Sequence, residues 1–285
     1  VTDYQSYVGT ASPMNFNGLV RHYDLRTGSN VADVQVNLTD KGSRKIQSHD
    51  IAKAMRPGIQ ELASKYNANV KVVEVPPGPP VLSTLVAEIY GPDYETQIDI
   101  ARQTKELFAQ TADVVDIDWQ VEDDQVEYKF NVLKEKAALL GVSTEQVVHS
   151  VGMALGGQEV TQLYAEKEQE QVGISLRFTE SERSSLEDLK KISILSMTGN
   201  KVALGDIIEI EETIQDKSIY RKNQKRVVYV TADIAGKLES PVYGILNMSD
   251  NMDKIQVPEG YTLSEEFTQQ PFIQDNYSLK WDGEW

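Results

Sequence analysis

The sequence contains no cysteine among its 285 residues. This absence excludes disulfide bonds, thiolate metal sites and thiol nucleophiles together, and it fits an oxidising compartment. No stretch approaches the roughly 18 consecutive apolar residues that a membrane-spanning helix needs. Residues 1–12 also lack the basic start and apolar core of a signal peptide. The sequence therefore predicts a soluble, folded chain, whose export, if the protein is exported, would depend on another segment.

Basic residues are scarce, since 28 Lys and Arg face 44 Asp and Glu and give a formal net charge of −16. Such a chain repels nucleic acid phosphates and anionic membrane surfaces. One basic stretch, residues 217–226, interrupts the acidic background and is typical of a solvated strand or hairpin. The length and the hydrophobic fraction of 40% predict two or three globular units.

Candidate catalytic groups are few. The three histidines, His22, His49 and His149, lie in no nucleophile or zinc motif. The acids of residues 116–127 fall on the spacing of a calcium-binding loop, but Val121 stands where its sharp turn needs glycine. We therefore predict that the chain is not an enzyme, with no catalytic residue, no metal site and no cofactor.

The first 125 residues predict two successive β-α-β units. The first has a strand around Val36, a helix over 49–66 that Pro57 should kink, and a strand at 69–75. The second repeats this order with a strand, a helix and a strand at 84–90, 93–111 and 114–121. This recurrence is typical of a tandem of split β-α-β subdomains.

From Val126 the pattern changes and predicts an inserted unit. It contains a helix capped by Ser143 with Gln146 in capping-box spacing, an alternating strand over 172–178, a helix over 181–191, and two strands around a Thr-Gly-Asn turn. A strand, a helix and a strand then follow in VVYVTADI, SPVYGILNMSDNMDKI and YTLSEEF. The predicted fold is α+β, with two ferredoxin-like split β-α-β subdomains and an α+β subdomain inserted in the second.

Two apolar loops, 7–18 and 73–83, are the most suggestive binding segments. The first carries Met14 and Phe16 between Gly9 and Gly18, an adaptable apolar surface of the kind used in promiscuous binding. The alternative is a loop that packs into a small core of its own.

A series of strings occurs in one order along the chain: YVGTASPMNFNGLVRHY, KVVEVPPGPP with LVAEIYGPD, EKAALLGVS, VTADIAG, SPVYGI and SLKWDGEW. In this order they resemble resistance-nodulation-division (RND) efflux permeases of the acriflavine-resistance type. The resemblance extends over essentially the whole chain and implies the second large periplasmic loop, between the seventh and eighth membrane helices.

The resemblance also implies a domain layout. It places a first porter subdomain at 1–83 and a second at 84–125 and 227–271. An inserted docking subdomain would occupy 126–226, and 272–285 would return towards the membrane.

By the same resemblance, the full protein is a homotrimer on the periplasmic side of the bacterial inner membrane. The transporter would be driven by protons and would pass apolar or amphiphilic substrates towards an outer-membrane channel. The partners of this region would be a periplasmic adaptor protein, the membrane helices of the same protein and its first periplasmic loop. The implied substrate path includes Met14, Phe16, Pro77, Pro80, Leu82 and Trp119. Gly9 and Gly18 would be the hinges of a switch loop at 9–17.

The chain departs from well-known drug pumps because its switch-loop region has less phenylalanine and is followed by a Pro-Pro-Gly-Pro-Pro run. Its six methionines are scattered along the sequence, which does not favour a pump for soft metal ions. The main alternative is a free periplasmic solute-binding protein, which would also be acidic, two-lobed and free of cysteine. Nothing in the histidines or carboxylates supports a third possibility, a hydrolase.

Overall fold

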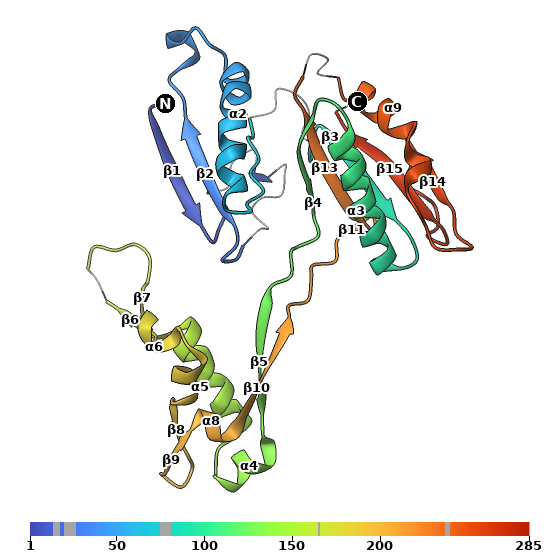
Figure 1. The fold of residues 1–285 in the computed structure, drawn as a ribbon. Coiled ribbons are helices and arrows are strands. Elements are labelled where there is room, and N and C mark those ends of the chain that lie inside the picture. The colour runs from blue at the N-terminus through green and yellow to red at the C-terminus, as the bar shows by residue number, and fades with distance from the viewer. Residues whose placement is uncertain (14–17, 20–26, 75–80, 165, 237–239, 285) are drawn as a thin grey trace. The chain divides into compact units, whose positions relative to one another are not determined.

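A computed structural model of the chain describes residues 1–13, 18–19, 27–74, 81–164, 166–236 and 240–284. The chain forms two compact units, one of Val1–Glu122 with Lys217–Trp285 and one of Asp123–Asp216 (Figure 1). The second unit is inserted in the first, as the change of pattern at Val126 predicts. No helix in the described ranges combines the length and the apolar character needed to cross a membrane.

The first unit is built around a five-stranded sheet with strand order β14-β15-β3-β13-β4. Its strands are β3 (Leu85–Tyr90), β4 (Val114–Trp119), β13 (Val228–Ile234), β14 (Leu263–Glu266) and β15 (Tyr277–Gly283). β14 and β15 are parallel, and the other neighbours are antiparallel. Four of these strands form the predicted split β-α-β sheet. The fifth, β15, was not predicted and lies between β14 and β3.

Two helices, α3 (Tyr94–Gln110) and α9 (Pro241–Ser249), pack on one face of this sheet (Figure 1). α3 begins at Asp93, whose carboxylate accepts a hydrogen bond from the Thr96 backbone N at 2.8 Å and caps the helix. A short 3₁₀ helix, η3 (Met252–Lys254), follows α9. Alternate side chains of β3 and one face each of α3 and α9 are buried together in one apolar core.

The opposite face of the sheet carries charges. Glu88 of β3 is 1% exposed, and it forms ion pairs with Lys222 and with Lys280, the latter at 3.6 Å. Lys280 lies 3.3 Å from Asp282 on the same strand. Burial and the Glu88 charge raise the pKa of Tyr229, on the neighbouring strand, to about 12. The two carboxylates and two ammonium groups balance, which lowers the cost of burying them.

Lys222 belongs to a hairpin of β11 (Arg221–Lys222) and β12 (Lys225–Arg226). Its turn residues Asn223 and Gln224 both have positive φ, as two-residue hairpin turns require. The hairpin in the basic stretch 217–226 was predicted. It is not merely solvated, however, because Lys222 reaches the partly buried charges on the sheet.

The first 74 residues contribute a two-stranded antiparallel sheet and a helix. β1 (Asp3–Val8) pairs with β2 (Ala32–Asn37), and a 3₁₀ turn, η2 (Lys41–Ser43), precedes α2 (Ser48–Ser64). β1 was not predicted. The predicted helix over 49–66 is present and continues as one helix through Pro57.

The predicted strand at 69–75 is wrong over its described part, since residues 69–74 form no strand. The physical reason lies in their bonding partners. The Val72 backbone N donates to the side-chain carboxylate of Asp116 at 3.2 Å, and Asn69 bonds through its side chain. Apolar alternation in the sequence cannot distinguish such side-chain bonding from a strand ladder.

The inserted unit has its own small apolar core, centred on Leu204 and Ile207, both 0% exposed. Its strands are β5 (Val126–Val132), β6 (Gln158–Leu163), β7 (Val172–Leu176), β8 (Ser193–Leu195), β9 (Lys201–Ala203) and β10 (Ile208–Ile214). Its helices are α4 (Lys134–Leu139), α5 (Thr144–Gly156), α6 (Glu180–Arg183), α7 (Leu186–Lys190) and α8 (Leu204–Ile207). β5 pairs with β10, β6 with β7, and β8 with β9.

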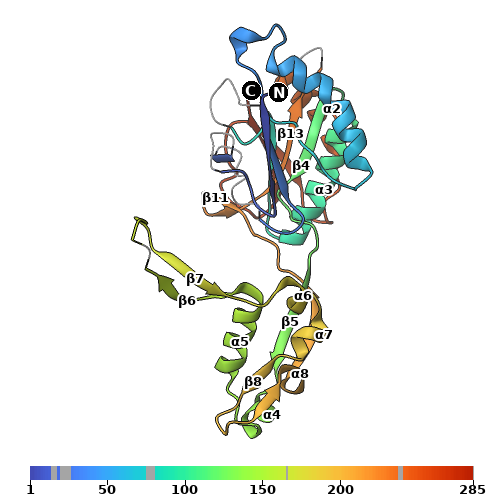
Figure 2. The same cartoon turned by 90° about the vertical axis from the view of Figure 1, so that its left-hand side faces the viewer.

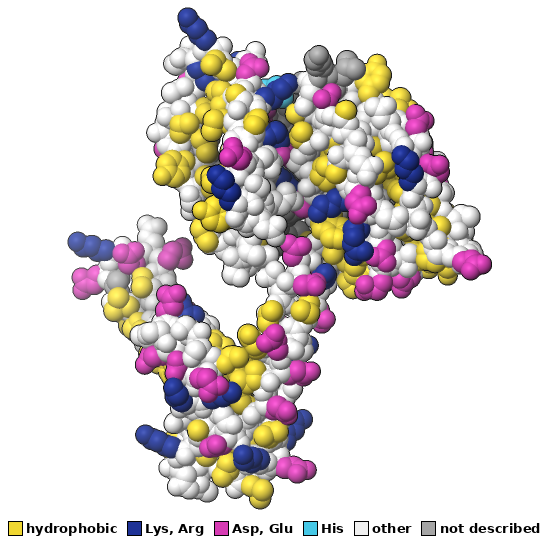
Figure 3. Space-filling view, in the orientation of Figure 1, with side chains coloured by type: hydrophobic (Ala, Val, Ile, Leu, Met, Phe, Trp, Pro, Cys, Tyr) yellow, Lys and Arg dark blue, Asp and Glu magenta, His cyan; other side chains and the backbone are white. Residues whose placement is uncertain are grey.

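Both hydrogen bonds of the predicted capping box at Ser143 and Gln146 are present. The predicted helix over 181–191 is two short helices instead, because Ser185 caps the second by accepting a hydrogen bond from Asp188 N at 3.1 Å. The β6–β7 hairpin projects away from α5 (Figure 2). Exposed acidic side chains, among them Glu209, Glu211 and Glu212, lie along the β5–β10 ribbon (Figure 3).

Candidate functional site

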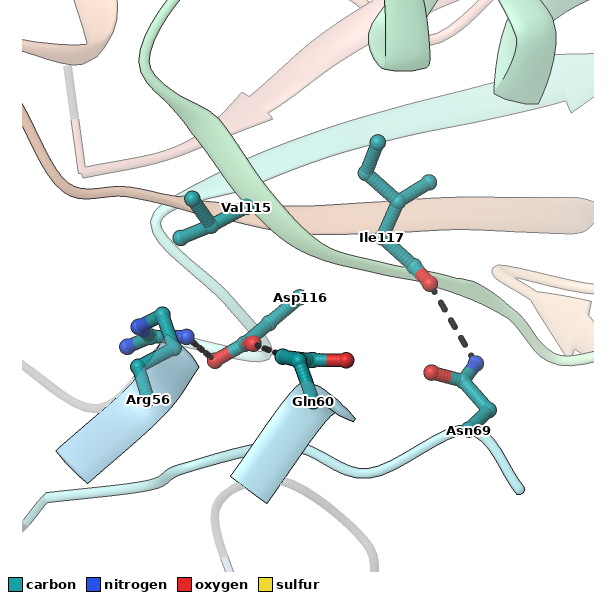
Figure 4. A pocket seen from close by; sticks show the side chains of 6 residues that line it. All are labelled: Arg56, Gln60, Asn69, Val115, Asp116 and Ile117. Atoms are coloured by element: carbon teal, nitrogen blue, oxygen red, sulfur yellow. Dashed lines mark hydrogen bonds and ion pairs between the residues drawn. The ribbon is translucent and has the colours of Figure 1, made fainter. Parts of the chain in front are cut away.

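The edge strand β4 meets α2 and residues 69–72 through two buried carboxylates. Asp116 forms an ion pair with Arg56 and accepts hydrogen bonds from Val72 N at 3.2 Å and, more weakly, from Gln60 Nε2 at 3.5 Å. Its side chain is 1% exposed. Figure 4 shows the Arg56 and Gln60 side chains converging on this carboxylate. Asp116 thus bonds three groups of a segment distant in sequence.

Asp118 repeats this arrangement two residues further along β4. It forms an ion pair with Lys71 and accepts a hydrogen bond from Asn69 Nδ2 at 3.1 Å. The same amide group lies 3.3 Å from the backbone O of Ile117 (Figure 4). Side-chain exposures of 16% for Lys71 and 11% for Asp118 make this pair nearly as buried as the first.

The alternation of β4 explains why Asp118 points away from the core. Its neighbours Ile117 and Trp119 pack against the core on the helix side of the sheet, so the acid between them points the other way. Asp116 has φ +53°, and the pairing of β4 with β13 is irregular at this place. Positive φ is uncommon for a residue other than glycine and costs of order 1–3 kcal/mol, so the surrounding bonds must hold Asp116 there.

A cavity of about 310 Å³ opens at this junction, lined by Arg56, Gln60, Asn69, Val115, Asp116 and Ile117 (Figure 4). Its polar side chains bond one another and the neighbouring backbone: Gln60 Nε2, for example, donates to Val70 O at 2.9 Å. Arg56 Nε is buried and has no hydrogen-bond partner among the described residues. The arrangement joins two segments of the chain and offers no nucleophile with an adjacent base.

The structure describes four of the eight predicted site residues. Met14, Phe16, Pro77 and Pro80 lie outside the described residues. The other four are Leu82, Trp119, Gly9 and Gly18, and the roles given to them stay predictions.

Leu82 and Trp119 are not among the residues that line the cavity. Leu82 is half-buried and precedes Ser83, whose hydroxyl donates to Ala232 O at 3.0 Å. Trp119 packs partly against the core, and Lys105 Nζ lies 5.0 Å from the centre of its ring. These two described residues of the implied path therefore lie outside the polar cavity.

Gly9 has φ +79°, a conformation that favours glycine. Its backbone N donates to Val31 O at 2.8 Å, and its carbonyl accepts from Gly28 N at 3.1 Å. Gly18 is described and half-buried. This backbone conformation favours glycine at position 9 whether or not the residue acts as a hinge.

Sequence reasoning missed the junction itself. It considered Asp116 and Asp118 only as part of a calcium loop. The structure uses these acids for pairs with Arg56 and Lys71, and it places no cluster of three or more His, Asp or Glu side chains for a metal ion within its described ranges. The available signal was the presence of two acids at alternate positions of an otherwise apolar strand, because buried acids need partners.

A split β-α-β sheet interrupted by a complete second unit is a distinctive α+β architecture. The family model described as the AcrB/AcrD/AcrF family matches residues 9–279, and the chain belongs to this family. One curated relative is the swarming motility protein SwrC of Bacillus subtilis (strain 168), with 21% identity over 178 residues. That match covers 61% of this chain and 16% of SwrC.

Two solved structures of a heavy metal efflux pump, crystal forms I and II, share the fold with a TM-score of 0.60 each. Their sequence identities to this chain are 18% and 20%. The matches cover 89% and 81% of this chain but only 25% and 24% of the pump chains. The chain thus spans a quarter or less of the length of these relatives.

Proposed function

We propose that this chain is the porter and docking region of a proton-driven RND efflux pump. The observation that carries the proposal is the family match over residues 9–279, on a fold in which one compact unit is inserted in a split β-α-β sheet. Membership of this family favours a transporter over a free solute-binding protein. Porter activity requires segments that bind a substrate weakly and change their relative position, rather than catalytic groups.

We further propose the domain layout 1–83, 84–125 with 227–271, 126–226 and 272–285. The inserted unit supports a separate docking subdomain. Its compact part ends at Asp216, because the following hairpin bonds to the five-stranded sheet through Lys222. In the full protein, the docking subdomain would face an outer-membrane channel. A periplasmic adaptor, the first periplasmic loop and the inner-membrane helices would complete a homotrimer.

Apolar or amphiphilic molecules are the proposed substrates. The two solved relatives are named as heavy metal efflux pumps, but their identity to this chain is too low to transfer a substrate. Soft metal ions need clustered thioethers. Here Met55 lies on α2 and Met153 on α5, whereas Met248 and Met252 pack in or against the core of the sheet. The described methionines therefore support an organic substrate better than Cu(I).

The full-length protein in an efflux-deficient bacterium provides the test. We expect it to lower the accumulation of an apolar fluorescent dye, and Phe16→Ala to raise that accumulation with unchanged protein level. Leu19→Ala, at a 57% exposed position close in sequence, is the matched control and should have little effect. A wild-type protein that leaves dye accumulation unchanged would contradict the efflux of apolar substrates. An unaffected Phe16→Ala variant would withdraw the switch-loop assignment alone.

A further inference from the structure

The junction of β4 with α2 differs from the other contacts of the sheet in how it is made. β4 is an edge strand, and residues 69–72 lie against its acidic residues without forming a ladder. Two of the bonds across this junction are Val72 N to the Asp116 carboxylate and Asn69 Nδ2 to Ile117 O. A β ladder between these segments would be a fixed joint. Bonds made through side chains can open without unfolding either segment.

One face of α2 supplies the matching groups. Lys53, Arg56 and Gln60 lie three and four residues apart and therefore share one side of the helix. Lys53 Nζ donates to Gly236 O at 3.3 Å, and the other two bond Asp116. This face carries the polar groups that point towards the sheet. It is a polar stripe where a permanent helix–sheet contact would normally be apolar.

The charge arrangement suits a contact that can be released. When residues 56–72 lie against β4, as in this structure, the two carboxylates of Asp116 and Asp118 and the cations of Arg56 and Lys71 are nearly buried. Their side-chain exposures lie between 1% and 16%. Removing such charges from water costs about as much as their attraction returns, so a buried pair adds little net stability. On opening, all four groups regain water together. An apolar contact of the same size would instead resist separation in proportion to its area.

We propose that Asp116 and Asp118 form an ionic latch, defined as these two residues with Arg56 and Lys71, that holds the first porter subdomain against β4. This inference rests on the proposed function and adds a regulation to it: the latch sets the fraction of molecules in which α2 and residues 69–72 are separated from β4. The strained φ of Asp116 aims its carboxylate at Arg56. When the latch opens, the backbone of Asp116 can return to a negative φ, which offsets part of the cost of opening. The latch can therefore exist in two states, closed and open.

Spin labels can measure the opening directly, because the chain has no cysteine of its own. Glu61→Cys on α2 and Glu106→Cys on α3 are exposed positions for the two labels. Pulsed electron spin resonance on the 285-residue chain then gives the distribution of distances between them. The distance does not depend on transport, so failure of the latch and failure of the proposed function are separate results.

Asp116→Asn combined with Asp118→Asn should increase the population at long label distances at least tenfold. Asp123→Asn with Asp216→Asn is the matched control, because it removes the same charge at exposed positions of the inserted unit. We expect this control to keep the wild-type distribution. Identical distributions in the latch variant and wild type would overturn the proposal, as would an equal broadening in the control.

Two further variants keep the test decisive if the double aspartate variant does not fold. Lys71→Gln leaves both buried carboxylates in place and should give a smaller shift in the same direction. Lys71→Asp with Asp118→Lys restores the pair with reversed charges and should return the short distance. Amide hydrogen exchange of β3, in the core of the sheet, confirms that each variant is folded. A swapped pair that stays open would show that the contact is not ionic and would also overturn the latch.

Discussion

Lys222 Nζ lies 2.8 Å from Asp282 Oδ2, which joins the hairpin that follows the inserted unit to the last strand of the porter sheet. Partial burial alone would lower the pKa of Lys222 and raise that of Asp282. Burial is the largest single influence on each group, but the hydrogen bonds and opposite charges of Asp282 and Glu88 together outweigh it for Lys222. For Asp282, the hydrogen bonds from Lys222, Glu88 and Gly283 N and the charge of Lys222 together do the same. The pKa of Lys222 is therefore well above its usual range and that of Asp282 well below.

These shifts predict the pH range in which the pair stabilises the fold. The contribution of Asp282 is complete above its unfolded pKa of about 3.9 and is lost as the pH falls towards its lowered folded pKa. The contribution of Lys222 is complete below about pH 10.4 and is lost as the pH rises through its raised folded pKa. The difference in Tm between wild type and Asp282→Asn should be largest between about pH 5 and 9 and should shrink below about pH 4.

Thermal unfolding followed by circular dichroism from pH 2 to 9 measures this difference. Asp99→Asn is the control, because the Asp99 side chain is 61% exposed and pairs with Arg102 on the surface of α3. Its Tm should stay close to the wild-type value at each pH, since exposed pairs contribute little. A difference for Asp282→Asn that does not change with pH would show that packing, not charge, is lost in that variant.

Trp281 is the main aromatic anchor of β15. It is 0% exposed, its ring stacks on Phe108 with 6.0 Å between centroids, and its Nε1 donates to Glu265 at 2.5 Å. We expect Trp281→Ala to lower the free energy of unfolding by ~3–5 kcal/mol, because it leaves a cavity in the core. Phe272→Ala, at a 92% exposed aromatic nearby in sequence, should stay within about 0.5 kcal/mol of wild type.

Urea unfolding gives both values, and hydrogen exchange of the β3 amides reports the sheet specifically. Equal losses for Trp281→Ala and Phe272→Ala would mean that β15 is peripheral. Trp281→Phe separates the two contributions of the tryptophan, because it keeps most of the apolar volume and removes the hydrogen bond to Glu265. Its cost should fall between those of the other two variants.

The contrast between β3 and β15 shows what the sequence can and cannot predict. LVAEIYGPD has continuous apolar character and a clear helix start, so strand and helix were both evident. SLKWDGEW alternates too, but Lys280 and Asp282 suggest a solvated segment until Glu88 and Lys222 are known to face them. Buried charge can be recognised only with its partners, and these are distant in sequence.

The same limit applies to the candidate site. Local signals predicted the Ser143 capping box and the 217–226 hairpin, because each depends on residues a few positions apart. The pairs of Asp116 with Arg56 and Asp118 with Lys71 join residues that belong to different predicted units. No periodicity encodes such a pairing. The predicted strand at 69–75 was wrong over its described part for the same reason, since residues 69–72 bond mainly to side chains of a distant strand.

Gly91 is required by packing. A Cβ at this position would lie 2.2 Å from Cδ1 of Tyr277, whose ring is 1% exposed and cannot move aside easily. We expect Gly91→Ala to destabilise the sheet by about 1–3 kcal/mol through overpacking. Gly58→Ala is the control, because a Cβ there meets nothing within 4 Å inside helix α2. It should be neutral or stabilise by about 0.5–1 kcal/mol.

Urea titration of the two glycine variants distinguishes crowding from a general effect of replacing glycine. Opposite signs are expected. A Gly91→Ala variant as stable as wild type would require Tyr277 to shift, and its edge-to-face contact with Tyr261, at 5.3 Å between ring centroids, would then change. Crystallography or the ring resonances of Tyr277 would detect that shift.

We expect the inserted unit to unfold independently of the five-stranded sheet. Ser143 Oγ accepts a hydrogen bond from Gln146 N at 3.1 Å, and the Gln146 side chain bonds back to Ser143 N and also donates to Leu195 O of β8 at 3.3 Å. Ser143→Ala should therefore destabilise the inserted unit by ~1 kcal/mol. Gln146→Ala should cost at least as much, because it also removes the bond from α5 to β8. Ser150→Ala, within the same helix, should be close to neutral.

Hydrogen exchange resolves where these losses occur. The inserted unit and the sheet have separate apolar cores, and separate cores open as separate cooperative units. In Ser143→Ala, exchange at the α5 amides should accelerate about fivefold, which corresponds to the expected loss of about 1 kcal/mol. Exchange at β3 and β13 should stay unchanged. Equal acceleration in α5 and β3 would show that the chain opens as one body. The docking unit would then have no independent stability.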